Sequence, residues 1–252
     1  MPNSVIRGSR GQRPVRAASL RSTWSVASFL VLACLAVPVK GQAVAEPELP
    51  PALTEYKGRV IAPTMHYTGA EWLTRESRQR EEDCATMLRE LGVREGTVVC
   101  DMGCGNGFYT LQLARMVGAT GRVLAVDIQS EMLHLLELQA MDEKLETIEA
   151  IHGTAVDPRL PPGKCDLILC VDVYHEFSHP EHMLAAMHAA LSEQGQLVLV
   201  EFRAEDPQVP IKPLHKMSKE QILAELTPNG FRLVREFDKL PWQHMMFFQR
   251  AR

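Results

Sequence analysis

The stretch Val98-Val-Cys-Asp-Met-Gly-Cys-Gly-Asn-Gly-Phe-Tyr-Thr-Leu-Gln-Leu-Ala114 decides the fold of this chain. An apolar run that ends at Asp101 indicates a buried strand, and apolar residues recur at helical spacing beyond the turn. Between them, Gly103, Gly105 and Gly107 alternate. Glycines let the backbone turn sharply and leave no Cβ between it and a ligand, and the helix start offers unpaired N–H groups. The stretch therefore predicts a strand–turn–helix unit that holds a nucleotide-like ligand.

The acidic residue ahead of the glycines narrows the choice of ligand. Dinucleotide folds carry G-x-G-x-x-G, whereas this turn reads Asp-x-Gly-x-Gly-x-Gly from Asp101. A carboxylate there would repel a pyrophosphate and suits a ligand with a positively charged amino acid end, such as S-adenosylmethionine. The apolar run 122–127 ends at Asp127, 20 positions after Gly107, about where such folds place the carboxylate that binds the ribose hydroxyls. The alternative is a glycine-rich turn with two ordinary strand-end aspartates.

Segments typical of strands and helices alternate along the rest of the chain. Strands are expected at 97–101, 122–127, 147–151, 166–171 and 196–202, and helices at 70–91, 107–117, 129–140, 180–192 and 218–227. Two last strands, 231–237 and 242–249, are expected to form a closing hairpin. This alternation predicts an α/β fold with a parallel sheet that is covered on both faces.

Residues 96–202 resemble the class I S-adenosylmethionine-dependent methyltransferases, within the broad group of ubiquinone/menaquinone-biosynthesis-like enzymes (methyltransferase type 11/25-like domains). The resemblance rests on the segments Val98–Gly107, Val123–Ile128, Gly153–Pro161, Cys165–Phe177 and Ala190–Phe202. It implies a Rossmann-like, mostly parallel sheet of seven strands with helices on both faces and a C-terminal antiparallel hairpin. It also implies S-adenosyl-L-methionine as the cofactor.

The resemblance assigns a set of cofactor-binding residues. Asp101 and the glycine turn would hold the methionine end, and Asp127 the ribose. Many relatives carry Asp after the glycine of the third segment, where it accepts from the adenine amino group, but here Thr154 stands there. Adenine contact by a side chain or by the backbone at Ala155 is therefore left open. The expected set is Asp101, Gly103, Gly105, Asn106, Gly107, Asp127, Ile128, Thr154, Ala155 and Asp172.

The polar cluster Asp172-Val-Tyr-His-Glu-Phe177 follows the fourth strand, at the sheet edge where such folds bind ligands. Methyl transfer chiefly requires alignment of nucleophile, methyl and sulfur, and it needs a base only if the nucleophile must lose a proton. The predicted catalytic residues are His175 as the base, Tyr174 as a contact near the sulfonium, and Asp172 to orient the amino acid end or the substrate. The alternative is that His175 and Glu176 cap the loop and Tyr174 packs.

A second polar segment follows the fifth strand and is a candidate substrate lid. Arg203, His215 and Lys216 could bind an anionic substrate there, or the segment could be a solvated loop. No Cys/His spacing typical of a zinc site occurs, so no metal site is predicted. The net charge is −4 and no Lys/Arg-rich stripe interleaves with aromatics, so the expected acceptor is a small molecule or lipid-like compound and not a nucleic acid.

The first residues have the features of a secretory signal peptide. Residues 1–23 contain five arginines and no acid, an apolar stretch follows at 24–39, and Ala43-Val-Ala45 is a small-x-small cleavage pattern. No stable membrane span is expected, because the apolar stretch is short and contains Pro38. The prediction is an exported, periplasmic protein. A lipoprotein anchored through Cys34, or a cytoplasmic protein with an uncleaved leader, are the alternatives.

The expected organisation is a leader at 1–45, a linker at 46–64 and a methyltransferase domain at 65–252. With 46% hydrophobic and 23% charged residues, the chain has the composition of an ordinary globular protein. The predicted function is S-adenosylmethionine-dependent methylation of a small-molecule or lipid-like acceptor. A non-catalytic module that binds S-adenosylmethionine or S-adenosylhomocysteine, and a nicotinamide-dependent oxidoreductase, are the alternatives. Nothing in the sequence predicts an oligomeric state.

Overall fold

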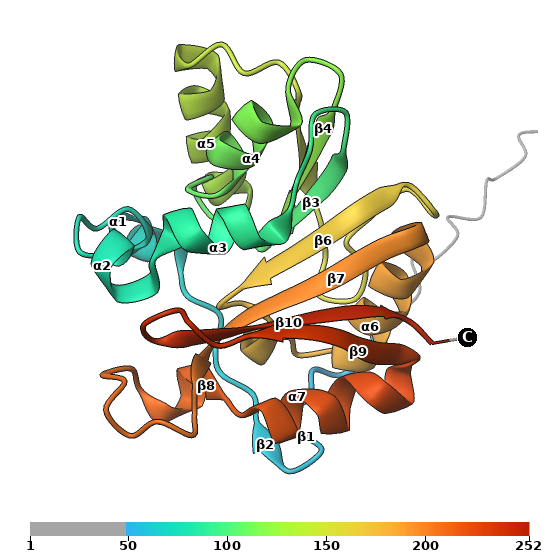
Figure 1. Cartoon of the computed structure of the whole chain (residues 1–252). Helices are drawn as coiled ribbons and strands as arrows, with labels where there is room; N and C mark the ends of the chain where they lie inside the picture. Colours follow the sequence, from blue (N-terminus) through green and yellow to red (C-terminus); the bar gives the residue numbers. More distant parts are fainter. Residues whose placement is uncertain (1–48, 252) are drawn as a thin grey trace, which may run out of the picture. The chain divides into compact units, whose positions relative to one another are not determined.

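A mostly parallel sheet lies at the centre of the computed structural model, which describes residues 49–251 (Figure 1). Its parallel strands are β3 (Val98–Met102), β4 (Arg122–Asp127), β5 (Ile148–His152), β6 (Cys165–Val171) and β7 (Leu191–Arg203). The antiparallel strands β9 (Phe231–Phe237) and β10 (Gln243–Arg250) extend the sheet beyond β7, in the order β5-β4-β3-β6-β7-β10-β9. The predicted seven-stranded sheet with a closing hairpin is confirmed.

The strand order reverses beside β3, which pairs with β4 on one side and β6 on the other. The chain therefore leaves the carboxyl ends of β3 and β6 in opposite directions, and a crevice opens between them. A two-residue strand that was not predicted, β8 (Lys216–Met217), pairs in parallel with the end of β7, beyond the last pair that β6 makes. This addition carries the segment after β7 back to the same edge.

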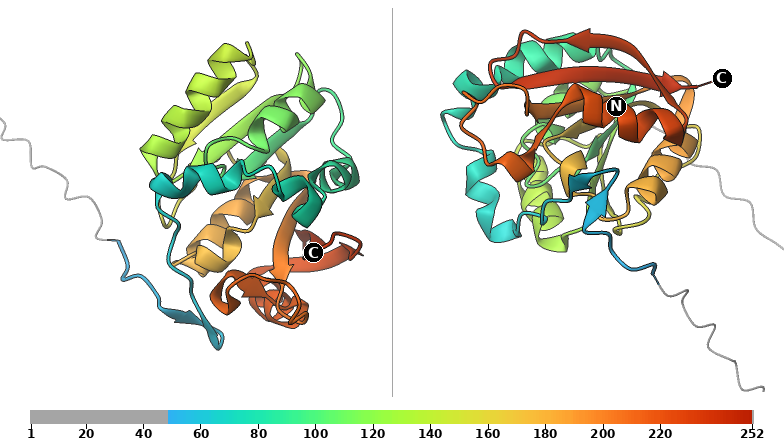
Figure 2. Two further views of the ribbon diagram at one scale, coloured as in Figure 1. Left: turned by 90° about the vertical axis from the view of Figure 1, so that its left-hand side faces the viewer. Right: turned by 90° about the horizontal axis from the view of Figure 1, so that it is seen from below.

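Alternate residues of the central strands face opposite layers of helices, as the period of two in a strand requires. One layer contains α6 (Pro180–Ala190) and α7 (Lys219–Leu226), and the other contains α3 (Cys84–Leu91) and α4 (Thr110–Val117), with α5 (Ser130–Asp142) beside β4 (Figure 2). In β3, for example, Cys100 packs toward α6 and α7, whereas Val99 packs toward α3 and α4. The strands are consequently apolar on both faces, which explains their continuous hydrophobic sequence.

The predicted leading helix at 70–91 is broken into three pieces, so the prediction of one continuous helix was wrong. The pieces are α1 (Ala70–Leu73), α2 (Arg78–Glu82) and α3. Between α2 and α3, Asp83 adopts a left-handed conformation with φ 48°, and its carboxylate accepts the N–H of Thr86 at 3.3 Å. The local hydrogen bond of this aspartate starts α3 and interrupts the helical pattern.

Residues 49–64, expected as linker, pack on the domain. They include the hairpin β1 (Glu55–Tyr56) and β2 (Arg59–Val60), which was not predicted. Arg59 is paired with Glu225 of α7, and its Nη1 donates to the carbonyl of His175 at 2.8 Å. The part of the domain that the structure describes therefore includes this segment. The predicted signal peptide and Cys34 lie outside the described residues.

Two further features bear on the predictions. Cys100, Cys165 and Cys170 lie in buried strands, and with Cys84 and Cys104 they are free thiols. Within residues 49–251, none of the helices combines the length and the apolar character that a membrane crossing demands.

Candidate active site

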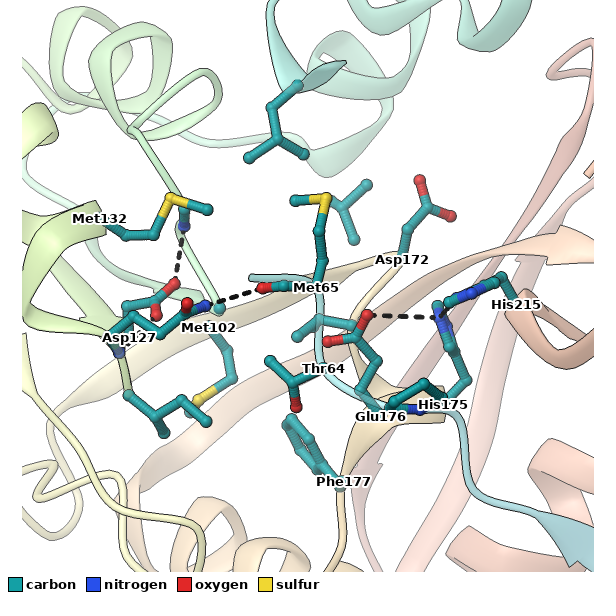
Figure 3. Close-up of a pocket in the computed structure, with 18 of the residues that line it drawn as sticks. Thr64, Met65, Met102, Asp127, Met132, Asp172, His175, Glu176, Phe177 and His215 are labelled. Carbon is teal, nitrogen blue, oxygen red and sulfur yellow. Dashed lines mark hydrogen bonds and ion pairs between the residues drawn. The ribbon is translucent and has the colours of Figure 1, made fainter. Parts of the chain in front are cut away.

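A cavity of about 620 Å³ lies at the carboxyl edge of the sheet, beside the crevice between β3 and β6 (Figure 3). Its walls come from the segment before α1, the glycine turn, the end of β4, and the segments that follow β6 and β7. Pockets of this size hold cofactors and drug-sized ligands. Within the described part of the chain, most of the residues predicted for the cofactor therefore meet Asp172 and His175, two of the three predicted for catalysis, in one cavity.

The glycine turn has the predicted position and the predicted sharp backbone, but a Cβ would meet protein side chains and not only a ligand. Gly103, Gly105 and Gly107 have φ of +67°, +54° and +94°, a region that side chains disfavour. A Cβ on Gly105 would lie 2.6 Å from Leu73 Cδ1, and a Cβ on either of the others would overlap a protein side chain. The glycines are thus required by backbone conformation and protein packing. Gly103 and Gly105 line the cavity, whereas Gly107 does not.

Asp127 ends β4 and lines the cavity in a fixed orientation. One oxygen accepts the N–H of Gly105 and the other the N–H of Gln129, each at 2.9 Å. Burial raises the pKa of this carboxyl, although the two N–H groups oppose the rise. The carboxylate therefore couples the glycine turn to the end of β4 and keeps lone pairs available toward the cavity.

Besides Gly107, two more of the residues assigned to the cofactor do not line the cavity. Asp101 faces α4, where it accepts the hydroxyl of Thr110 at 2.6 Å, and burial raises its pKa to about 6. Asn106 is buried, and its side-chain amide donates to the carbonyl of Ala70 at 3.2 Å. Both side chains therefore stabilise the turn and the start of α4. The prediction that these two residues and Gly107 contact the ligand directly does not agree with their positions.

The loop expected to lie near the adenine borders the cavity. Ile128, Thr154 and Ala155 all line it. The hydroxyl of Thr154 accepts the N–H of Asp157 at 2.9 Å, so this side chain shapes its own loop. Asp157 does not line the cavity.

Asp172 ends β6 and carries an unsatisfied oxygen. Its backbone is left-handed, with φ 49°, which turns the chain sharply toward the cavity. One oxygen accepts the amide of Gln243 at 2.7 Å, and the other is buried without a partner among the described residues. Burial and the nearby carboxylates of Glu82 and Glu201 raise the pKa of Asp172. A buried acceptor of this kind suits a positively charged ligand group.

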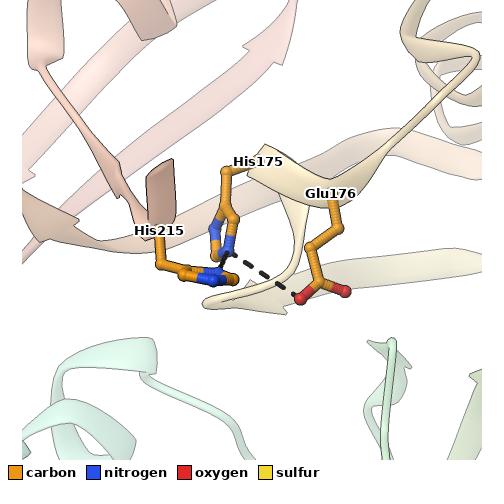
Figure 4. A group of neighbouring side chains, drawn as sticks. All are labelled: His175, Glu176 and His215. Carbon is orange, nitrogen blue, oxygen red and sulfur yellow. Dashed lines mark hydrogen bonds and ion pairs between the residues drawn. The ribbon is translucent and has the colours of Figure 1, made fainter. Parts of the chain in front are cut away.

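His175 is the centre of a polar cluster with Glu201, Glu176 and His215. Figures 3 and 4 show His175 with Glu176 and His215. Its Nδ1 lies 2.7 Å from Glu201 Oε2, and its Nε2 lies 3.1 Å from His215 Nδ1. Glu176 Oε1 lies 4.0 Å from the same Nε2. Burial opposes protonation of His175, but Glu201 outweighs it and raises the pKa of the imidazole. Burial also raises the pKa of Glu176, to about 7.

Tyr174 is not placed for the predicted contact near a sulfonium. The short 3₁₀ helix η2 (Tyr174–Glu176) directs successive side chains about 120° apart, so that His175 and Glu176 line the cavity and Tyr174 enters the core. Its hydroxyl donates to Glu225 at 2.9 Å, and its ring meets Phe177 edge-on. Tyr174 therefore packs in the core, as the alternative interpretation expected.

The segment after β7 reaches the cavity, but only some of its basic residues line it. His215 and Lys212 line the cavity. Arg203 instead donates to the carbonyls of Leu240 and Gln243, and Lys216 donates to the carbonyl of Val209. These two cations stabilise loops and are not placed to bind an anionic substrate.

Sequence reasoning overlooked three residues that shape the site. Arg78 of α2 lines the cavity and pairs with the buried Glu82 at 2.8 Å. Gln243 of β10 orients Asp172, and Glu201 of β7 orients His175. Glu201 could have been found, since it is the one acid in the apolar run 197–202, but no pattern singled out Arg78 or Gln243.

Residues 94–245, more than half of the chain, match the family described as methyltransferase domain. Demethylmenaquinone methyltransferase of Oceanobacillus iheyensis is 24% identical over 114 residues, 45% of this chain and 48% of the relative. The same enzyme of Staphylococcus aureus (strain JH9) is 26% identical over 127 residues, half of each chain. The chain thus spans about half the length of the curated relatives it matches.

Solved structures agree with the family match. A SAM dependent methyltransferase from Aquifex aeolicus is 25% identical and superimposes with a TM-score of 0.69, over 73% of this chain and 98% of that one. The [4+2]-cyclase SpnF, 20% identical with a TM-score of 0.51 over 58% of this chain and 54% of that one, shares the fold alone. With the glycine turn, the strand order and the cavity as described, the chain belongs to the methyltransferase domain family, in the class of S-adenosylmethionine-dependent methyltransferases.

Proposed function

We propose that this chain transfers a methyl group from S-adenosylmethionine to a small-molecule or lipid-like acceptor. The observation that carries the proposal is the single cavity that joins Asp127 and the glycine turn to the cluster of His175 and Glu201. When bound, S-adenosylmethionine supplies a methyl group on a positively charged sulfur, which is a good leaving group. The protein then chiefly has to align the acceptor with that methyl.

The residues present fit this cofactor. Asp127 offers carboxylate lone pairs for the ribose hydroxyls, and the unpartnered oxygen of Asp172 suits the ammonium of the amino acid end. Met102, Val126 and Met132 form an apolar wall beside Asp127. Such a wall suits the flat adenine ring, whose edge would meet the loop at 154–155.

The acceptor part of the cavity combines apolar walls with a polar end. The apolar residues are Met65, Phe177, Met183, Phe202, Pro210 and Ile211. Two relatives are named demethylmenaquinone methyltransferases, which supports an acceptor with an apolar body and a reactive polar position. His175, polarised by Glu201, is the side chain placed to take a proton from that position.

The proposal is tested with the full-length chain and its His175→Ala variant. Calorimetry should detect S-adenosylhomocysteine with micromolar affinity and no binding of NAD. Labelled methyl should pass from S-adenosylmethionine to compounds in a panel of hydroxylated aromatics and lipid extracts. With an acceptor in hand, His175→Ala should lower kcat by roughly 10²–10⁴-fold and leave the affinity for S-adenosylhomocysteine nearly unchanged.

Three outcomes would contradict parts of the proposal. Binding of NAD without S-adenosylhomocysteine would favour the oxidoreductase. Binding of S-adenosylhomocysteine without transfer to any acceptor would favour the non-catalytic module. Transfer to nucleic acid or protein, with none to small molecules, would overturn the acceptor class.

We also propose that the leader exports the protein. The support is the order of arginines, apolar stretch and Ala43-Val-Ala45 in the sequence. Mass spectrometry of protein made in a bacterial host should find a terminus at or near Glu46 in the periplasmic fraction. An intact Met1 terminus in the cytoplasm would contradict export, and a lipid-modified Cys34 would favour the lipoprotein.

A further inference from the structure

Two histidines and a carboxylate converge at one end of the cavity (Figure 4). One ligand atom from each of His175, Glu176 and His215 lies within 4.8 Å of the other two. The imidazole nitrogens are 3.1 Å apart, and His175 Nε2 is 4.0 Å from Glu176 Oε1. An ion held at about 2.0–2.2 Å places its ligand atoms about 3–3.5 Å apart. The three side chains therefore already have nearly the spacing of a metal site.

Glu201 determines which nitrogen of His175 faces this convergence. A carboxylate can only accept, so the Nδ1 that lies 2.7 Å from Glu201 carries the hydrogen. In the neutral ring, the lone pair is then on Nε2, which points to His215 and Glu176. The other oxygen of Glu201 accepts the backbone N–H of Tyr174 at 3.0 Å, so the carboxylate itself is held in place. A buried carboxylate behind a ligating histidine is the usual second layer of a metal site.

The contact between the two imidazoles is also compatible with a bound ion. Without one, the 3.1 Å contact requires a hydrogen on one nitrogen and a lone pair on the other. Because Nε2 of the neutral His175 carries a lone pair, the hydrogen lies on Nδ1 of His215. Binding of a cation would shift that hydrogen to Nε2 of His215, so that the ring stays neutral and Nδ1 offers its lone pair to the metal. The carboxylates of Glu176 and Glu201 would balance the charge of a dication.

We propose that His175, Glu176 and His215 bind a divalent transition metal ion at the acceptor end of the cavity. Two imidazoles and one carboxylate suit Zn²⁺, Fe²⁺ or Mn²⁺ better than Ca²⁺ or Mg²⁺, which prefer oxygen ligands. All three residues line the cavity, so the remaining coordination positions would face it. Open positions are the mark of a catalytic metal site.

The metal site would also bind the methyl acceptor. This second inference rests on the proposed function. An oxygen of the acceptor would occupy an open position, where a divalent ion lowers the pKa of a hydroxyl. His175 could not then serve as a base, because its Nε2 lone pair would be used by the ion. The base role of His175 therefore belongs to the metal-free protein.

The metal site is tested on the full-length chain after removal of metals with a chelator. Calorimetry with Zn²⁺ should give about one ion per chain, and Co²⁺ should produce visible absorption bands typical of nitrogen and oxygen ligands. His215→Ala, at a half-buried position, should weaken Zn²⁺ binding by at least about 100-fold and abolish the Co²⁺ bands. Glu201→Gln should weaken it by about 10- to 100-fold.

The matched control is His134→Ala, which removes an exposed histidine of α5 outside the cavity and should leave both readouts unchanged. Melting curves verify that each variant is folded. Equal Zn²⁺ affinity in wild type and His215→Ala, or absence of Co²⁺ bands in the wild type, would overturn the metal site. The same preparations are titrated with S-adenosylhomocysteine. A wild-type chain that binds S-adenosylhomocysteine but no metal contradicts this inference, and a wild-type chain that binds metal but no S-adenosylhomocysteine contradicts the proposed function.

Discussion

At the scale of single residues, the cavity depends on carboxylates whose orientation is set by the backbone. Asp127 accepts N–H groups from both the glycine turn and the residues after β4, and Asp172 is oriented by Gln243. Side chains fixed in this way lose little freedom when a ligand binds, so their hydrogen bonds contribute to affinity without a large ordering cost.

Asp127→Ala should weaken the binding of S-adenosylhomocysteine by about 1–3 kcal/mol, because the ribose hydroxyls lose a charged acceptor. The variant also frees the N–H of Gly105, so the glycine turn should become less rigid. Calorimetry measures the affinity. Asp157→Ala, on the neighbouring loop and outside the cavity, is the control and should bind normally. Unchanged affinity in Asp127→Ala would remove this residue from the cofactor site.

Asp101 should make the stability of the chain depend on pH. Burial raises its pKa to about 6 in the folded chain, compared with about 3.9 in an unfolded one. The folded state therefore holds the proton more tightly, and this stabilisation is present below pH 4 and lost as the pH rises through 6. The change amounts to at most about 3 kcal/mol.

The measurement is urea unfolding of wild type and Asp101→Asn at pH 4, 5.5 and 7. Asparagine keeps an acceptor for the hydroxyl of Thr110 but does not titrate in this range. Relative to wild type, the variant should gain in free energy of unfolding as the pH rises. Parallel pH curves for the two proteins would show that Asp101 does not titrate as its burial requires.

At the scale of elements, the side chain of Arg59 links the hairpin β1–β2 to both α7 and η2. Arg59 makes two hydrogen bonds to Glu225, at 2.7 and 2.9 Å, and one to the carbonyl of His175. The side chain of Arg59 is only 9% exposed and that of Glu225 is fully buried. The pair therefore links the first described segment to α7, and through the carbonyl of His175 to η2.

Arg59→Ala should lower the free energy of unfolding by about 3 kcal/mol or more, because it leaves the Glu225 carboxylate buried without its cation. Chemical denaturation measures the loss. The double variant Arg59→Met, Glu225→Gln should recover much of it, since neither side chain then carries a charge. If the double variant is as unstable as the single one, the unpaired charge is not the cause.

At the scale of the whole molecule, the cavity takes its walls from segments that lie far apart in the sequence, from Pro63 to His215. A ligand that contacts several of these segments should stabilise the whole fold. At 100 times its dissociation constant, S-adenosylhomocysteine should add about 2.7 kcal/mol to the free energy of unfolding. For a chain of this size, the melting temperature should rise by roughly 5–11 °C.

Thermal melts with and without S-adenosylhomocysteine provide the test, with NAD at the same concentration as the control. Asp127→Ala should show a smaller rise than wild type at equal ligand concentration. A rise with NAD that equals the rise with S-adenosylhomocysteine would contradict the assignment of the cavity.

The sequence by itself determined the fold and the place of the site. The strands β3, β4 and β6 are apolar on both faces. A strand that contains Asp101 near its end and leads into three alternating glycines is found in few kinds of site other than a ligand-binding turn. Because the carboxyl ends of parallel strands meet at one edge, Asp127, Asp172 and His175 could be expected to line one cavity. These are consequences of local pattern and of sheet geometry.

Only the tertiary structure decided which way each side chain points and what it meets. Tyr174 and His175 are neighbours in sequence, yet one turn of η2 sends the first into the core and the second into the cavity. His215 comes from a segment 40 residues further on and is brought beside His175 by the pairing of β8 with β7. Spacing along the chain carries no signal for such long-range contacts, which arise only when the sheet is assembled.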